Sequence, residues 1–127
     1  MITSLNHVTV LVRDQDEALA FYTEKLGLEK RADDMFGEGY RWLTVAPPGQ
    51  TNLEIVLNPA FGPQDEVKIG KLPGWVFHTD DCQADYERLK GRGVKFTEAP
   101  TEQMWGMQAL FEDLYGNQFV LLQPSGG

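Results

Sequence analysis

The sequence is poor in the residues that build disulfide, metal and nucleic-acid sites. Its 127 residues include one cysteine, Cys82, and two histidines, His7 and His78. A single cysteine excludes an internal disulfide and fits a reducing compartment. The 11 basic residues against 19 acidic ones give a net charge of −8. This charge repels phosphates and anionic lipid surfaces, so we expect neither a nucleic-acid partner nor a membrane partner.

Long hydrophobic runs are also missing. No window approaches the roughly 18 apolar residues of a membrane helix, and the N-terminus lacks the basic and apolar regions of a signal peptide. Glycine-rich phosphate loops and local Ser/His/Asp or Cys/His groupings are absent, so no catalytic residue is assigned. With 42% hydrophobic and 24% charged residues, we expect one cytoplasmic domain over residues 1–127.

The pattern of secondary structure occurs twice in the chain. The spacing predicts a strand, a helix that starts after an aspartate and ends near a glycine, and then three strands. In the first half these are the strand 6–12, the helix between Asp14 and Gly27, and strands near 29–33, 40–46 and 52–57. In the second half they are a strand from Gly74, the helix between Asp81 and Gly91, and strands near 94–97, 107–112 and 117–122.

The two capping aspartates lie 67 residues apart, and "LEIVLNP" and "FVLLQP" end the two halves in similar fashion. An internal duplication of a βαβββ unit explains this self-similarity. We expect module 1 at about 5–58, a Pro- and Gly-rich linker at about 59–73, and module 2 at about 74–124. The predicted fold class is α+β, with tandem βαβββ modules forming a curved mixed sheet around a cup.

Strand parity assigns side chains to the two faces of the first module's sheet. Val8, Val10 and Val12 form the apolar set of the first strand and are expected to pack on the helix. His7 and Thr9 then point to the other face, which would line the cup. The same argument puts Leu53, Ile55 and Leu57 on the helix side of the last strand, so Glu54 shares the cup face with His7. Trp42 is placed there as well.

The duplicated βαβββ pattern, together with "LNHVTVLVRD", "ALAFYTEKLGL", "LEIVL" and "WGMQALFEDLYGNQFVLLQP", resembles the vicinal oxygen chelate superfamily. That group includes glyoxalase I, bleomycin-resistance proteins and extradiol dioxygenases. The resemblance covers about residues 5–124 and implies the fold, a cup and a homodimer. In metal-using members, the first strand and the last strand of each half each supply one ligand to a divalent ion. His7 and Glu54 match these positions in the first half.

The second half departs from the ligand pattern. Its matching positions are Gly74, seven residues before Asp81, and Val120. Neither side chain can ligate a metal, and His78 lies four strand residues, or roughly 13 Å, beyond Gly74. One histidine and one carboxylate fall short of the usual three protein ligands. We therefore predict no cofactor, and a divalent metal stays open as the alternative.

Two functional interpretations involve a ligand, and a third is an interaction module whose cup is filled. The first is a small-molecule-binding protein with a degenerate metal site, whose cup is lined by His7, Thr9, Trp42, Glu54, Trp105 and Val120. The alternative is a divalent-metal-dependent lyase, isomerase or dioxygenase in which His7 and Glu54 are ligands. Aromatic side chains on a concave face suit an apolar or planar ligand. The sequence does not identify that ligand.

Overall fold

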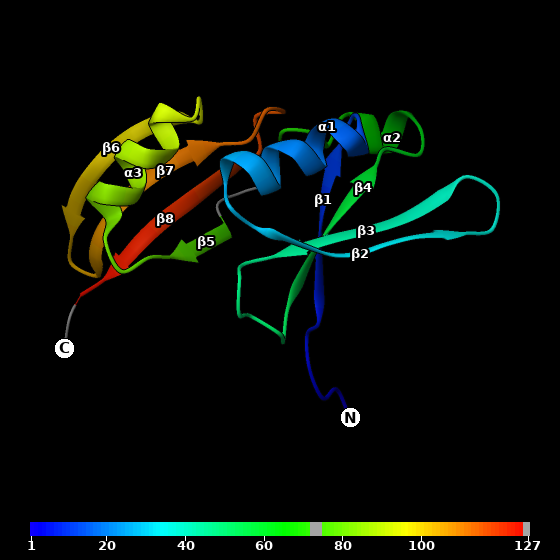
Figure 1. Cartoon of the computed structure of the whole chain (residues 1–127), viewed down its shortest axis with the longest axis horizontal. Helices are drawn as coiled ribbons and strands as arrows, with labels where there is room; N and C mark the ends of the chain where they lie inside the picture. The colour runs from blue at the N-terminus through cyan, green and yellow to red at the C-terminus, as the bar shows by residue number, and fades with distance from the viewer. Residues whose placement is uncertain (72–74, 126–127) are drawn as a thin grey trace. The chain divides into compact units, whose positions relative to one another are not determined.

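The computed structural model describes residues 1–71 and 75–125, which divide into two units, Met1–Ile69 and Gly70–Gly127. Each unit has the predicted βαβββ order and holds a four-stranded mixed sheet, which confirms the α+β fold class (Figure 1). No helix in the described part of the chain is long and apolar enough to span a membrane.

Unit 1 has the strand order β1-β4-β3-β2, with β1 parallel to β4 and the other neighbours antiparallel. Its elements are β1 (His7–Val12), α1 (Gln15–Ala20), η1 (Phe21–Lys25), β2 (Glu29–Phe36), β3 (Tyr40–Ala46), β4 (Glu54–Pro59) and the short helix α2 (Pro63–Glu66). The α2 turn lies in the segment that we expected to be an irregular linker. It begins with a proline, whose fixed φ suits the first helical position.

The helix of unit 1 starts and ends where its sequence signals predict. The Asp14 carboxylate accepts a hydrogen bond from the Glu17 amide at 3.0 Å, which caps α1. The last turn widens into the π-helical segment η1, which the apolar spacing did not predict. Gly27 then adopts a φ of +80°, and the Leu28 amide bonds back to the Tyr22 carbonyl at 3.0 Å. A glycine reaches this conformation without steric cost.

Burial in unit 1 follows the predicted faces in part: Val8 on the predicted helix side is half-buried, and Val56, which pairs with Thr9 on the other face, is buried. Val10 and Val12 are 1% and 0% exposed, and Leu57 on β4 is fully buried with them. These side chains pack beneath α1 together with Ala18 and Tyr22, which the helix contributes to the core. We call the opposite surface of this sheet, which carries His7, the non-helix face.

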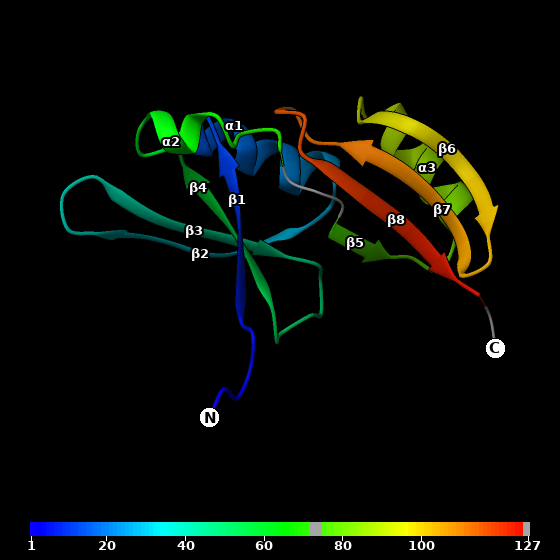
Figure 2. The same ribbon diagram turned by 180° about the vertical axis from the view of Figure 1, so that it is seen from behind.

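Unit 2 repeats this arrangement with the strand order β5-β8-β7-β6. Its elements are β5 (Trp75–His78), α3 (Cys82–Gly91), β6 (Lys95–Gln103), β7 (Gly106–Glu112) and β8 (Gln118–Pro124). Asp81 caps α3 as predicted, accepting from the Ala84 amide at 3.0 Å. Figures 1 and 2 show α3 covering one face of this sheet, where Phe111 and Phe119 are buried.

Several predicted strands were too short. β2 continues to Phe36 and β6 to Gln103, although their sequences "ADDMF" and "TEAPTEQ" lack apolar alternation. Both strands lie at a sheet edge and pair along their length with the next strand of a hairpin. Backbone pairing, rather than burial, holds these extensions, so periodicity could not detect them.

Candidate functional site

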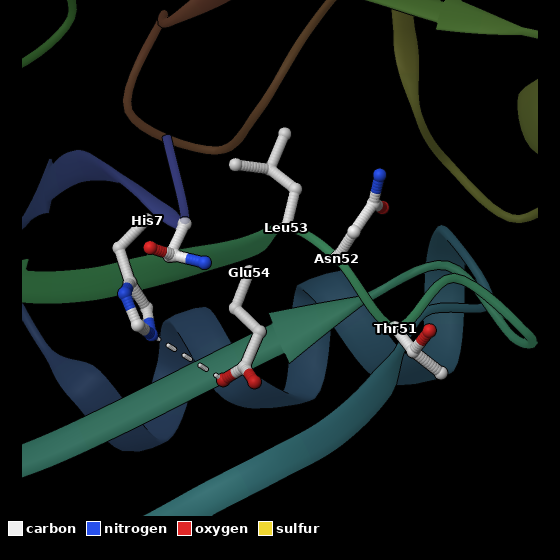
Figure 3. Close-up of a pocket in the computed structure, with 6 residues that line it drawn as sticks. His7, Thr51, Asn52, Leu53 and Glu54 are labelled. Carbon is white, nitrogen blue, oxygen red and sulfur yellow. Dashed lines mark ion pairs between the residues drawn. The ribbon is translucent and has the colours of Figure 1, made fainter. Parts of the chain in front are cut away.

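His7 and Glu54 lie next to each other on the non-helix face of unit 1. They are paired residues of the parallel strands β1 and β4, so their side chains leave the sheet side by side. His7 Nε2 lies 3.9 Å from Glu54 Oε1. Figure 3 marks this contact with a dashed line. The side chains are 42% and 29% exposed, respectively. The pair is therefore open to solvent, and a ligand could reach both groups.

The Glu54 carboxylate has a second partner that fixes its orientation. The Thr44 hydroxyl on β3 donates a hydrogen bond of 2.6 Å to Glu54 Oε1. Thr44 is fully buried, so this hydroxyl has little competition from water. Thr44 shares the parity of Trp42 on β3 and therefore belongs to this face, but sequence reasoning missed it as a site residue. A threonine two residues beyond Trp42 on the same strand face was the signal for it.

Trp42 closes one side of the pair. Its ring centroid is 5.2 Å from that of His7, and the ring planes meet at 66° in an edge-to-face contact. Thr9 belongs to the same face by parity and is exposed, opposite Val56 on β4. Unit 1 thus brings His7, Trp42 and Glu54 into contact around Thr44. Their role in binding stays a prediction.

A pocket of about 200 Å³ opens beside this group. It is lined by Asn6, His7, Thr51, Asn52, Leu53 and Glu54. In Figure 3 the side chains of Glu54 and Leu53 leave the strand in opposite directions, as adjacent strand residues do. Sequence reasoning missed the side-chain amides and the hydroxyl among these residues. The polar run "QTN" directly before the strand was the available signal.

The donor set of unit 1 does not fit a catalytic metal ion. No group of three His, Cys, Asp or Glu side chains that could hold a metal occurs within residues 1–71 and 75–125. His7 and Glu54 supply two candidate ligands, and Thr44 already donates to one carboxylate oxygen. Catalytic zinc sites use three protein ligands. Gly74, the expected third position, lies outside the described residues.

The strand register changes the position expected to match Glu54 in unit 2. Val120 pairs with Val76 on β5. Aligned on the helix caps, Val76 corresponds to Thr9, and Thr9 pairs with Val56. Gln118 therefore lies at the position of Glu54, and Val120 lies at that of Val56. Matching the strand ends by sequence had placed the equivalent of Glu54 two residues too late, at Val120, because sequence alone does not give the pairing between strands.

Gln118 is a neutral residue whose side-chain amide lies 3.4 Å from the Thr97 hydroxyl. It carries no carboxylate, so the contrast between the two halves remains. Trp105 stands at the turn between β6 and β7, 54% exposed, and its indole Nε1 donates to Gln108 Oε1 at 2.8 Å. His78 ends β5 opposite Leu122 and is exposed. Participation of Val120 and Trp105 in a shared cup stays a prediction.

The family model named Glyoxalase/Bleomycin resistance protein/Dioxygenase superfamily matches residues 4–121. The chain belongs to this superfamily. This chain is 40% identical over 128 residues to an uncharacterized protein of Shewanella frigidimarina. The match covers 97% of this chain and 95% of the relative.

Among solved structures, UcmS2 has a TM-score of 0.85 at 42% identity, covering 96% of this chain and 98% of its own. TnmS3, described as an antibiotic binding protein from Streptomyces sp. CB03234, has a TM-score of 0.86 at 40% identity and covers 98% of both chains. The resemblance stated from the sequence motifs is confirmed by the superfamily match.

Proposed function

We propose that this superfamily member binds a small organic molecule on the non-helix face of unit 1, without a metal ion. The observation that carries the proposal is the group formed by His7, Glu54, Trp42 and Thr44. It combines a hydrogen-bonding pair with an aromatic wall, next to a polar pocket. Small-molecule sites commonly join an apolar surface with a few convergent polar groups. The similarity to an antibiotic binding protein supports the same class of ligand.

The chemistry of the group indicates a ligand with a flat apolar part and at least one hydrogen-bond donor. Trp42 offers an indole surface to the flat part. Glu54 accepts hydrogen bonds, while the side-chain amides of Asn6 and Asn52 can both donate and accept. Binding without chemical conversion would sequester the ligand.

A ligand screen by thermal shift, followed by calorimetry, tests the proposal. We expect a hit to bind His7→Ala and Glu54→Ala more weakly by about 1–3 kcal/mol each, because a buried polar partner of the ligand is lost. Thr9→Ala should weaken binding less, since a neutral hydroxyl makes a weaker bond than a charged group. His78→Ala, which removes the exposed histidine of unit 2, is the matched control. Hits whose affinity does not depend on His7 or Glu54 would contradict the proposal.

The divalent-metal enzyme remains the second candidate, because His7 and Glu54 place two potential ligand atoms 3.9 Å apart. Elemental analysis of protein purified without chelator separates the two functions. We expect no stoichiometric metal, since a third ligand group is lacking in the described residues. If the wild-type protein contained one metal ion per chain and the His7→Ala variant contained none, the result would favour the metal-dependent enzyme and contradict the proposal of a metal-free site.

We further propose a homodimer in the cytoplasm that does not bind nucleic acid. The net charge of −8 opposes contact with phosphates. The single cysteine fits a reducing compartment.

A further inference from the structure

Strands β3 and β4 of unit 1 separate just beside the candidate site. Their pairing covers two residue pairs, Thr44 with Val56 and Val45 with Ile55. Continuing this register would pair Leu43 with Leu57, yet the ladder ends at Thr44. Figures 1 and 2 both show the β2–β3 hairpin diverging from β4 toward its tip. Trp42 therefore sits on a part of β3 that the described β3–β4 ladder does not cover. Two residues away, the Tyr40 hydroxyl on β3 still donates to Asn58 Oδ1 on β4 at 3.3 Å.

One side chain from the helix bridges this gap. Gln15, the first residue of α1, donates from its carboxamide Nε2 to the Arg41 carbonyl at 3.1 Å and to the Leu57 carbonyl at 2.9 Å. These carbonyls belong to β3 and β4, respectively, and Arg41 directly precedes Trp42. Gln15 thereby replaces the missing ladder bonds and fixes the distance between the two strands.

Unit 2 lacks this arrangement at the equivalent place. There β7 and β8 pair over seven residue pairs, from Gly106–Pro124 to Glu112–Gln118. The residue equivalent to Gln15 is Cys82, which directly follows the capping Asp81. Its Sγ lies 3.7 Å from the Leu121 carbonyl, the register counterpart of Leu57. The bridging carboxamide thus occurs in the unit that holds the His7–Glu54 pair.

We propose that Gln15 is a positioning residue for the binding site: acting from the helix face of the sheet, it sets where Trp42 lies against His7. The role of Gln15 in ligand binding rests on the proposed function, whereas its effect on the Trp42–His7 contact does not. Gln15 itself lies on the side of the sheet opposite Trp42, so it does not touch the ligand. Loss of its two hydrogen bonds removes the bridge between the Arg41 and Leu57 carbonyls, while the side-chain bond from Arg41 to Asp16 on α1 remains. The backbone of β3 next to Trp42 can then shift relative to β4, which loosens the edge-to-face contact between Trp42 and His7.

Proton NMR of the two histidine rings tests this without any ligand. An indole 5.2 Å away shifts the His7 ring signals through its ring current, and Trp42→Leu supplies the signal position without that contact. At a pH where both imidazoles are neutral, Gln15→Met should move the His7 signals most of the way to the Trp42→Leu position. The His78 signals in the same spectrum should stay in place. Gln15→Glu, which keeps the size but has no donor when ionised, should act similarly.

Gln83→Met is the control variant, because Gln83 also lies in the first turn of a helix and bonds within it, to Glu87 at 3.3 Å. It should leave the His7 signals unchanged. Unmoved His7 signals in folded Gln15→Met and Gln15→Glu would overturn the proposal. General loss of signal dispersion in both variants would also overturn it, since Gln15 would then hold the whole fold rather than one contact.

The proposed function fails separately from this inference. If the wild-type protein bound no ligand, the NMR comparison would still test whether Gln15 positions Trp42 against His7. If a ligand that needs Trp42 is found, Gln15→Met should weaken it several-fold, and ligands that do not need Trp42 should bind as before. Equal losses for both kinds of ligand would contradict a positioning role.

Discussion

At the scale of single residues, Thr44 shows how a small polar side chain organises the candidate site. It is fully buried on the non-helix face and donates at 2.6 Å to a carboxylate that is 29% exposed. The bond joins β3 to β4 on the face opposite Gln15. Glu54 is thus held on one side by Thr44 and faces His7 on the other, so its rotamer is set before any ligand arrives.

Replacing this hydroxyl tests its contribution. We expect Thr44→Val, which keeps the shape of the side chain, to lower the free energy of unfolding by about 1 kcal/mol, the typical net value of one hydrogen bond. Urea unfolding followed by circular dichroism measures this change. Thr9→Val, at an exposed position on the same face, should change stability by less than about 0.5 kcal/mol. Equal effects of both substitutions would show that the Thr44–Glu54 bond adds no stability.

At the scale of elements, an ion-pair group fastens the β2–β3 hairpin. Arg41 on β3 donates from Nε and one terminal nitrogen to both oxygens of Asp33 on β2, at 2.8 and 2.9 Å. Its other terminal nitrogen binds Asp16 on α1 at 2.7 Å. The two-pronged geometry with Asp33 is the strong form of this interaction. Asp16 is 85% exposed, so its share is smaller.

This group predicts a specific response to acid. The hydrogen bonds from Arg41 lower the pKa of Asp33 from 3.8 to about 2. Because the folded state then binds fewer protons than the unfolded one, this stabilisation is complete above pH 3.8 and declines as the pH falls toward 2. After solvent screening we expect about 1 kcal/mol from it.

Urea unfolding at several acid pH values measures that loss. Asp33→Asn should flatten the decline of stability in this pH range, because the titrating carboxylate is gone. Asp34→Asn is the control. Asp34 is the next residue on β2 and pairs with Trp42 of β3, so it lies on the sheet face opposite Asp33. An unchanged slope in Asp33→Asn would mean that other carboxylates cause the acid loss.

At the scale of the whole molecule, exposed apolar side chains point to a partner surface. Unit 1 leaves Phe36 and Phe61 57% and 61% exposed, respectively, and Phe36 pairs across the hairpin with Tyr40. Clustered apolar exposure commonly marks an interaction site, and edge strands add unpaired backbone groups. Tyr40 lies beside Phe61, with ring centroids 6.0 Å apart. The two aromatic rings therefore contribute to the same surface.

We expect light scattering at micromolar concentration to give the mass of a dimer. Phe36→Ser should shift the equilibrium toward monomer, because it removes an exposed apolar side chain from this surface. Thr97→Ser, an exposed position in unit 2, is a control that should leave the mass unchanged. A monomer mass for the wild-type protein would refute the homodimer.

Much of the architecture follows from local rules that act within a few residues. Asp14 and Asp81 cap their helices because a carboxylate can accept from the amide three residues on. The alternation of Val10 and Val12 with Thr9 sorts one strand into two faces, which also placed His7 and Glu54 together. Spacing of these signals, repeated in the second half, was enough to predict two βαβββ units.

Tertiary structure alone decided the remaining features, because they depend on pairings between distant segments. The early end of the β3–β4 ladder and its replacement by Gln15 join residues 15, 41 and 57, and no local pattern contains that information. The match of Gln118 rather than Val120 to Glu54 likewise needed the observed strand register. Sequence periodicity tells which face a side chain takes, whereas register and strand separation arise when backbone groups find their partners across the sheet.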